Sequence, residues 1–399
     1  MQKNPRSVRR GRAAVIAGIG LAAVTAAYLL FVFSPIPLLR SLRNLWIETA
    51  MTTANHKWLA TAFIPRSIVD GVMGELANPG LEALGGGAYL DERPAAPGTT
   101  FLPETTTSPQ TTVTPETTVT PETTAAPETT AMPETTAAPQ TTAAPADILD
   151  QANLVVGQPD YAGYPVTVND LAEGLYITEV SGMGYRGYAM LIDDPARVFV
   201  GKTTLADEGL RIPSMLAEYG AIAGINASGF DDPEGLGSGA LPVGKSCSRG
   251  VLTGEYSDFY SSIVFTETDR LVVGLLDDWT KYNIRDGIQF SPVLIADGEQ
   301  KVFDSAGWGL QPRTAIGQRE DGAVIFLVID GRDLSYSIGI TVGEMANIMM
   351  KYGAVNAACC DGGSSCVLAY RGEVINRNTS KNPTLGRRLP NAFLVAPKG

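Results

Sequence analysis

Between residues 97 and 144 the sequence consists of proline-led hexads that cannot contribute to a folded core. Proline recurs every six residues, at positions 97, 103, 109, 115, 121, 127, 133 and 139, and threonine fills most of the positions between them. Proline lacks a backbone N–H and threonine offers little apolar surface, so the segment favours extended, polyproline-like chain. At about 3.1 Å per residue it reaches on the order of 150 Å. We therefore predict a disordered Pro/Thr-rich stalk that links, over residues 95–146, two differently built parts of the chain.

An uncharged apolar stretch lies before this linker. Residues 13–33, AAVIAGIGLAAVTAAYLLFVF, carry no charge over 21 positions. A helix of that length, at about 1.5 Å per residue, is enough to cross a hydrocarbon core of roughly 30 Å. Basic residues precede it at positions 3, 6, 9, 10 and 12, and such residues stay on the cytoplasmic side. The sequence predicts a single-pass cell-membrane protein with a cytoplasmic basic tail (1–12), a transmembrane helix (13–33) and an extracellular remainder.

A cleaved secretory signal is the alternative interpretation of the same stretch. Signal peptides also combine a basic head with an apolar run, but that run is usually about 7–15 residues long. The sequence that follows, SPIPLLR, contains no clear cleavage site with small residues. A retained anchor is therefore favoured over a cleaved signal.

The segment between the apolar stretch and the linker has an amphipathic pattern. Aromatic and aliphatic residues recur at helical spacing beside Arg40, Arg43 and Lys57, which predicts a juxtamembrane amphipathic region over residues 34–94. His56, the only histidine of the protein, lies here, and we interpret it as a solvated or packing residue.

Residues 147–399 have the composition of a folded, glycine-rich domain of about 250 residues, long enough to bury a substantial core. Short apolar runs such as GAVIFLVIDGR (322–332) and SCVLAYRGEVINR (365–377) predict strands joined by hairpins, with YRGE as one turn. Helices are predicted over residues 204–220 and 341–354, the second opened by a capping box at Thr341. The predicted fold class is α+β, with mixed, largely antiparallel sheet and packed helices.

The charge of this domain limits the partners that it can have. It contains 20 basic and 31 acidic residues, a net charge of −11. Nucleic acid and anionic membrane surfaces both require a basic footprint, so neither is expected as a partner of this domain. The membrane is expected as a partner only through residues 13–33.

All four cysteines, at positions 247, 359, 360 and 366, belong to the outward domain, where disulfides can persist. A bridge from Cys247 to Cys359 or Cys366 is open, whereas the vicinal pair Cys359 and Cys360 would face opposite sides of a strand. The spacing does not fit a zinc site, which also usually needs histidine. We expect buried thiols or one disulfide and no metal ligands.

Four stretches place polar residues at the ends of apolar runs. They are AGINASGFDD (223–232), PRTAIGQ (312–318), VIDGR (328–332) and CCDGGSSC (359–366). A strand end holds a side chain rigidly, and the glycine after it lets a ligand approach the backbone. Asp-Gly is also the commonest hairpin turn signal, so each stretch alone is ambiguous and only their convergence would make a site.

In this order, the four stretches resemble the phosphodiester glycosidase family, whose animal member uncovers mannose 6-phosphate by removing N-acetylglucosamine. The motifs that carry the resemblance, between residues 221 and 397, are Gly224-Ile225-Asn226, Pro312-Arg313-Thr314-Ala315, Asp330-Gly331-Arg332, Asp361-Gly362-Gly363-Ser364-Ser365, Asn376-Arg377 and Asn391-Ala392. The chain also looks like the bacterial, membrane-anchored branch often labelled as exopolysaccharide-related. It departs from the family at "ASGF" after Asn226 and at Cys360, where leucine is usual. The resemblance implies a hydrolase that acts on a sugar joined to phosphate through its anomeric carbon.

The residues themselves suit that chemistry. Arg313 and Arg332 offer permanently charged, planar donors for phosphate oxygens. The amides of Gly362, Gly363 and Ser364 are candidates for an anion-binding nest. Asp330 and Asp361 are the candidate catalytic carboxylates, one to stabilise or attack the anomeric carbon and the other to manage protons or water.

The remaining candidates are neutral or peripheral. Asn226 is expected to contact a sugar hydroxyl or N-acetyl group, or else to form a turn. Thr314, Ser364 and Ser365 either orient the phosphate or cap turns, and Asn376 and Arg377 are expected at the rim of the site or in solvent. A serine hydrolase triad is disfavoured because the domain contains no histidine to activate a serine.

The predicted function is a membrane-anchored, extracytoplasmic hydrolase that cleaves a glycosyl phosphodiester in a cell-wall polymer or exopolysaccharide. A tethered module that binds anionic glycans without catalysis and a glycosyl-phosphate transferase are the alternatives. No cofactor is predicted with certainty; a divalent cation shared by Asp330 and Asp361 remains open, although their spacing gives no support for one.

Overall fold

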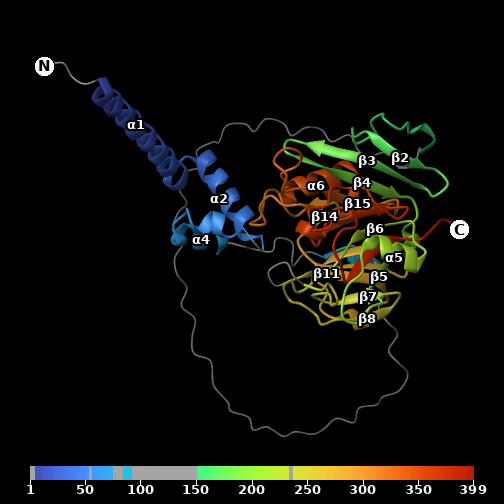
Figure 1. The fold of residues 1–399 in the computed structure, drawn as a ribbon. Helices are drawn as coiled ribbons and strands as arrows, with labels where there is room; N and C mark the ends of the chain where they lie inside the picture. The colour runs from blue at the N-terminus through green and yellow to red at the C-terminus, as the bar shows by residue number, and fades with distance from the viewer. Residues whose placement is uncertain (1–4, 54–55, 75–83, 92–150, 233–236) are drawn as a thin grey trace, which may run out of the picture. The chain divides into compact units, whose positions relative to one another are not determined.

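The computed structural model describes residues 5–53, 56–74, 84–91, 151–232 and 237–399. The predicted stalk over residues 95–146 lies outside these residues. The described chain combines helices with three antiparallel sheets, so the predicted α+β class is confirmed (Figure 1).

The helices fall into an N-terminal group and two helices of the later domain. The α-helices are α1 (Pro5–Phe33), α2 (Pro37–Met51), α3 (Trp58–Thr61), α4 (Arg66–Met73), α5 (Ile212–Tyr219) and α6 (Val342–Lys351). Short 3₁₀ turns are η1 (Gly87–Tyr89), η2 (Gln151–Asn153), η3 (Pro195–Arg197), η5 (Trp279–Lys281) and η6 (Gly363–Ser365).

An eight-stranded sheet forms the centre of the later domain. Its order is β13 (Glu299–Gln300), β12 (Val293–Ala296), β16 (Ala354–Cys360), β14 (Arg313–Arg319), β15 (Val324–Ile329), β4 (Tyr185–Ile192), β3 (Leu175–Gly182) and β2 (Val166–Asp170). The strand β15, VIFLVI, is buried along its whole length, as expected for a β-branched run covered on both faces.

Two smaller sheets pack with it. The six-stranded sheet has the order β1 (Leu84–Gly85), β10 (Leu271–Gly274), β9 (Ser261–Thr266), β11 (Ile284–Phe290), β7 (Ser246–Ser248) and β8 (Val251–Thr253). The five-stranded sheet has the order β18 (Glu373–Val374), β17 (Leu368–Tyr370), β6 (Ala223–Asn226), β19 (Asn391–Val395) and β5 (Val198–Lys202). One continuous hydrophobic core, which includes Tyr176, Phe265, Phe326 and Phe393, joins the three sheets.

The register of three central strands decides where the polar strand ends lie. Arg313, the first residue of β14, pairs with Ile329, the last residue of β15. Thr314 pairs with Cys360, the last residue of β16. Because neighbours in an antiparallel sheet run in opposite directions, the start of β14 and the ends of β15 and β16 share one edge.

Three local predictions can be compared with the structure. Thr341 caps α6 by accepting a hydrogen bond from the Glu344 amide at 3.2 Å, and YRGE forms the β17–β18 turn, both as predicted. The helix predicted over residues 204–220 is shorter than expected and occupies only α5. Leu210 exchanges backbone hydrogen bonds with Leu389, at 3.0 and 2.9 Å, and this extended pairing prevents an earlier helical start.

The chain before the linker is part of the same folded body as the chain after it. Leu84 and Gly85 form the edge strand β1 against β10, and the Gly86 amide donates to Asp297 Oδ1 at 2.7 Å. Thr49 of α2 accepts a hydrogen bond from the Leu310 amide at 3.0 Å through its Oγ1. The described residues before and after the linker therefore belong to one folded body.

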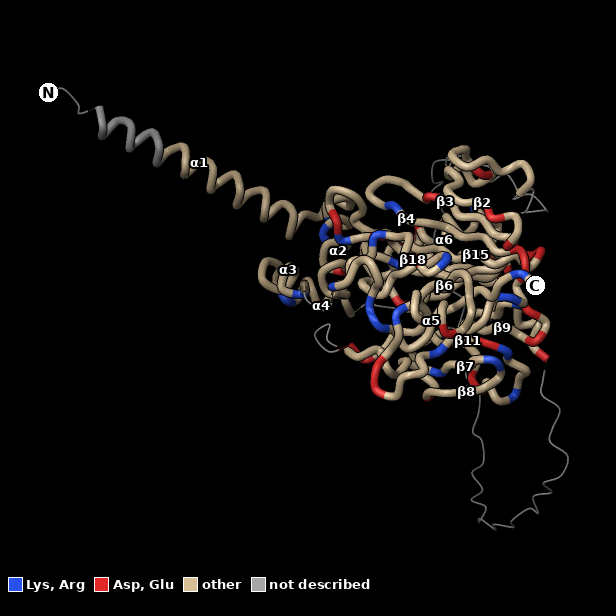
Figure 2. The backbone as a smooth tube through the Cα atoms, turned by 45° about the vertical axis from the view of Figure 1, so that its right-hand side comes forward, with Lys and Arg blue, Asp and Glu red and all other residues tan. Residues whose placement is uncertain are grey.

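Among the described residues, one helix is long and apolar enough to cross a membrane, by length and composition. Its apolar part is Val15–Phe33, with a mean hydropathy of 2.3, and only 6% of it is buried. Figure 2 shows this part of α1 without any Lys, Arg, Asp or Glu. Arg43 of α2 donates to the Val32 carbonyl at 2.8 Å, which joins α2 to the end of α1.

We expect the folded body to survive cleavage of the linker. A protease site inserted near residue 118 of the full-length protein in detergent should give two fragments that co-elute, because β1 and α2 hold the later domain. Size-exclusion chromatography checks this. Gly309→Ala should weaken the association, since its Cβ would lie 2.5 Å from the Thr49 amide, whereas Gly298→Ala meets nothing within 4 Å and serves as the control. Complete separation of the wild-type fragments would contradict the expectation.

Candidate active site

A pocket of about 580 Å³ opens at the shared edge of β14, β15 and β16. We call it the polar pocket. Its walls combine charged side chains, a glycine-serine turn and aromatic rings: Thr52, Thr53, His56, Phe230, Asp232, Phe259, Tyr260, Phe290, Trp308, Gln311, Pro312, Arg313, Arg332, Cys360, Asp361, Gly362, Gly363, Ser364, Ser365 and Arg387. The sequence places these residues in six separate segments, and the sheet register brings the segments together.

Two arginines on the wall of the polar pocket have no acidic partner within the described residues. Arg313 is buried, and its guanidinium donates to the carbonyls of Ile340, Trp308 and Gly309 at 2.8–2.9 Å. Arg332 is exposed and donates to Gln311 Oε1 at 3.0 Å. Burial lowers the pKa of Arg313, but an arginine in a protein keeps its proton. Asp361 is close enough for its charge to act on Arg332, but neither arginine forms an ion pair among the described residues, and such a wall favours an anionic ligand.

Two carboxylates line the polar pocket, and Asp361 is the one without an ion pair among the described residues, because Asp232 is paired with Arg387. Asp361 directly follows β16, and its Oδ1 accepts a hydrogen bond from the Gly362 amide at 2.9 Å. Removal from water raises its pKa to about 6, against the opposing effects of the Ser365 hydroxyl and the nearby Arg387 charge. A carboxyl group with this pKa can exist in either protonation state near neutrality, as acid–base and nucleophilic chemistry requires.

Asn226 and Thr314 lie beneath Asp361 and do not line the pocket. The Asn226 amide donates to the Asp361 carbonyl at 2.6 Å, while its Oδ1 accepts from the Thr314 hydroxyl at 2.7 Å and from the Val367 amide at 3.1 Å. Both side chains are fully buried. These contacts couple the five-stranded sheet to the eight-stranded sheet. The geometry gives both residues a positioning role, whereas a contact with a sugar was predicted for Asn226 and a contact with phosphate or a turn cap for Thr314.

The glycine turn does not form the predicted anion nest. The Gly362 amide is bound to Asp361 Oδ1, and the Gly363 amide donates to the Pro312 carbonyl at 2.9 Å. Gly363 instead permits close packing, because it has a φ of +63° and a Cβ at this position would lie 3.0 Å from Arg332 Nη2. The glycine thus leaves room for the arginine beside it. Ser364 and Ser365 line the pocket.

Asp330 lies behind the polar pocket. Its Oδ1 accepts from Asn376 Nδ2 at 2.8 Å, and its Oδ2 accepts from the Arg377 amide at 3.0 Å and the Tyr336 hydroxyl at 3.3 Å. Burial raises its pKa to about 6. Asn376 and Arg377 line a separate surface pocket. The structure therefore brings Arg313, Arg332 and Asp361 together but places Asp330, Asn376 and Arg377 beside them, outside the pocket.

Sequence reasoning missed several residues of the polar pocket. Tyr260 and Phe290 stack with ring centroids 5.2 Å apart and form an apolar surface opposite the charges. Arg387 forms an ion pair with Asp232 at 2.7 Å and donates to the Ser364 hydroxyl at 3.3 Å. Asp232 belonged to a quoted stretch, but Tyr260, Phe290 and Arg387 belong to no motif that could have identified them, and Phe290 is an apolar residue at the end of β11.

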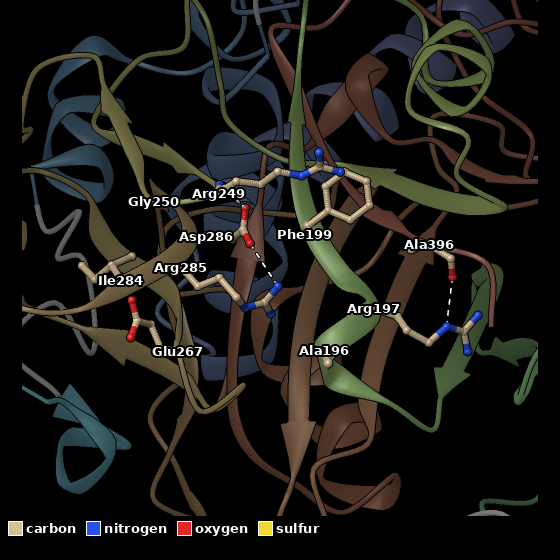
Figure 3. Close-up of a pocket in the computed structure, with 10 residues that line it drawn as sticks. All are labelled: Ala196, Arg197, Phe199, Arg249, Gly250, Glu267, Ile284, Arg285, Asp286 and Ala396. Carbon is tan, nitrogen blue, oxygen red and sulfur yellow. Dashed lines mark hydrogen bonds and ion pairs between the residues drawn. The ribbon is translucent and has the colours of Figure 1, made fainter. Parts of the chain in front are cut away.

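A second pocket, of about 520 Å³, contains three arginines but has a different charge balance (Figure 3). Arg285 is paired with Asp269 at 3.0 Å and Asp286 at 3.1 Å, and Arg197 is paired with Glu173 at 3.2 Å. The Asp286 carboxylate also accepts hydrogen bonds from the amides of Val200 and Arg249. These charges hold loops together, so the polar pocket is the stronger candidate for an anionic ligand.

The structure also places the four cysteines and the side chains that could bind a metal. All four cysteines are buried thiols, and burial raises the pKa of Cys359 to about 11, which makes it a poor nucleophile. Within the described ranges, no cluster of three His, Cys, Asp or Glu side chains could hold a metal ion.

Gly363→Ala should weaken the binding of an anion by the polar pocket. The added Cβ meets Arg332, so we expect inorganic phosphate to bind at least several-fold more weakly in isothermal titration calorimetry. Gly372→Ala is the matched control: its φ is +85°, but nothing lies within 4 Å of the added Cβ. Both variants should lose roughly 1 kcal/mol of folding free energy from the left-handed conformation. Equal phosphate binding by the two variants would show that Arg332 does not hold the anion.

Parts of the chain are similar to known proteins. The model of the family described as phosphodiester glycosidase matches residues 219–396. The SPbeta prophage-derived uncharacterized protein YomE of Bacillus subtilis (strain 168) is 29% identical over 202 residues, which span 46% of this chain and 29% of that protein.

Two solved structures are also similar. The catalytic domain of zebrafish N-acetylglucosamine-1-phosphodiester alpha-N-acetylglucosaminidase, auto-inhibited by its pro-peptide, has a TM-score of 0.47 and 16% identity, over 56% of this chain and 82% of that one.

The second solved structure is a hypothetical protein from Synechocystis, with a TM-score of 0.42 and 17% identity, over 59% of this chain and 64% of that one. The family match begins just before β6 and ends after β19, so it includes the strand ends that carry Arg313, Arg332 and Asp361. Residues 219–396 of the chain are therefore similar to the phosphodiester glycosidase family.

Proposed function

We propose that the protein is a hydrolase that cleaves a glycosyl phosphodiester, with the polar pocket as its active site. One observation carries the proposal. Arg313 and Arg332 face the pocket without an acidic partner among the described residues, beside a carboxylate whose pKa is near 6. Two guanidinium groups suit a phosphate diester, and the stacked Tyr260 and Phe290 offer the apolar surface on which a sugar ring packs.

The proposed reaction consumes one water. The water oxygen bonds to the anomeric carbon, and the bond from that carbon to the phosphate oxygen breaks with its electron pair left on the phosphate. One water hydrogen remains on the new sugar hydroxyl and the other leaves as a proton. Ionised Asp361 stabilises the positive charge that develops on the sugar, or attacks the carbon itself, and the arginines stabilise the departing phosphate.

The location of the reaction follows from α1. Its apolar length supports a membrane anchor, and the basic residues before it support a cytoplasmic N-terminus and an extracytoplasmic pocket. A phosphate-containing wall polymer or exopolysaccharide is then the accessible class of substrate. Asn226 and Thr314 fix the Asp361 turn, and Asp330 fixes the neighbouring turn through Asn376.

Replacement of the two aspartates separates catalysis from structure. Asp361→Asn should lower kcat by on the order of 100-fold or more while phosphate still binds, because the arginines remain. Asp330→Asn should instead cost roughly 1–3 kcal/mol of folding free energy, with kcat of the folded protein reduced less than tenfold. Sugar release from a panel of UDP-sugars and wall-derived phosphodiesters measures kcat, and urea unfolding measures stability. If the wild-type protein binds these compounds but releases no sugar, it is a binding module and the proposal fails.

The pH dependence of the reaction should report Asp361. We propose that its ionised form acts, so kcat/KM should rise with pH, reach half its maximum near pH 6 and stay constant above that. Asp330 also has a pKa of about 6, and His56 lies at the rim, so Asp330→Asn and His56→Gln are the controls that should keep this limb. A profile that falls through pH 6 would assign Asp361 the role of a general acid.

A further inference from the structure

The polar pocket is not isolated, because an apolar pocket of about 400 Å³ adjoins it. Leu42, Leu45 and Trp46 of α2 form one wall of the apolar pocket, and Leu310, Leu334 and Ile338 of the later domain form the other. The two pockets share Thr53, His56, Gln311 and Arg332. A ligand that spans both would therefore have its charged group at Arg332 and its apolar part between α2 and the 333–338 turn.

Several large apolar side chains of the apolar pocket are exposed to solvent. Leu334 is 90% exposed, Leu42 49% and Trp46 47%. Exposed apolar surface of this kind marks a site for a ligand, a membrane or a partner protein. Pockets that take apolar ligands have this composition, and a cavity of roughly 150 Å³ is enough for benzene. By that measure the apolar pocket accommodates on the order of ten to fifteen carbon atoms.

The apolar pocket also lies close to the end of the apolar helix. Three residues separate Phe33 of α1 from Pro37 of α2, and Arg43 binds the Val32 carbonyl. The helix α2 contains 15 residues, so its far end is about 22 Å from its start. The linker adds nothing to this distance, since it follows β1. If α1 spans a membrane, the apolar pocket opens within one short helix of the membrane surface.

We propose that the substrate is a lipid-linked sugar phosphate, whose lipid chain occupies the apolar pocket while Arg332 holds the phosphate and the sugar enters the polar pocket. This inference rests on the proposed function. It identifies the second group on the phosphate, on the side away from the sugar, as a lipid alcohol. The order of the groups in such a molecule, which is sugar, phosphate and then lipid, matches the order of Asp361, Arg332 and Leu334 along the joined pockets. Hydrolysis at the anomeric carbon would release the free sugar and leave the lipid monophosphate.

The test compares two phosphate esters that differ only in chain length. The full-length protein in lipid nanodiscs is titrated with methyl phosphate and with decyl phosphate, and empty nanodiscs correct for partition into the bilayer. Decyl phosphate should bind at least tenfold more tightly, because each fully buried methylene is worth roughly fourfold in affinity. Leu334→Asp should reduce this preference to less than threefold.

Leu241→Asp is the matched control, since Leu241 is 76% exposed and lines neither pocket. It should keep the full preference for decyl phosphate. Equal affinity of the wild-type protein for the two esters would overturn the inference, and so would equal behaviour of the two variants. Binding needs no turnover, so the two proposals can fail separately. Sugar release without chain-length preference retains the hydrolase and overturns the lipid, whereas chain-length preference without sugar release retains the lipid and overturns the hydrolase.

Discussion

The antiparallel register of β14 between β15 and β16 determines where Arg313, Arg332 and Asp361 of the polar pocket lie. Arg313 opposite Ile329 and Thr314 opposite Cys360 bring the start of one strand level with the ends of its two neighbours. A slip by one residue would turn each side chain to the other face of the sheet, so Arg313 would leave the pocket. Side-chain hydrogen bonds of β14 oppose such a slip, because the Thr314 hydroxyl donates to Asn226 Oδ1 at 2.7 Å and Gln318 Oε1 accepts from the Leu271 amide at 2.7 Å. The stability of the sheet centre and the geometry of the pocket therefore have the same cause.

The charge balance at that edge explains why the arginines suit a ligand. The Arg313 guanidinium donates hydrogen bonds to three backbone carbonyls, which orient it but do not neutralise its charge. In the second pocket, by contrast, Arg285 and Arg197 are bound to carboxylates and have little attraction left for an anion. Arg313, Arg285 and Arg197 thus differ in role. Arg313 binds carbonyl oxygens, whereas Arg285 and Arg197 form ion pairs with carboxylates. A buried charge without a counter-ion is costly to the fold, and an anionic ligand offsets that cost.

The sequence predicted the strand ends but not the directions of all their side chains. Polar residues after apolar runs correctly pointed to one sheet edge, where Arg313, Arg332 and Asp361 meet. Asp330 obeys the same pattern, yet it turns toward Asn376, and Arg332 two residues later has a φ of +61° that ends the strand alternation. Alternation predicts side-chain direction only while the chain stays extended. Asn226 shows a second limit, since its amide is occupied by the Asp361 carbonyl, and only the contact between two sheets reveals this. Tyr260, Phe290 and Arg387 depend on the same long-range pairing.

The segments before the linker, β1 and α2, pack against the later domain. A spacer of polyproline type would let a domain sample a volume far from the bilayer, and the pocket would then meet soluble polymers freely. Here β1 and α2 come before the linker and bind the later domain, so α2 and not the linker fixes the distance between pocket and helix end. The wall of the polar pocket consequently includes Thr52, Thr53 and His56, which precede the linker. If α1 is a membrane anchor, as we propose, the short segment that joins the anchor to the domain also lines the pocket, and substrates at the membrane surface are then favoured.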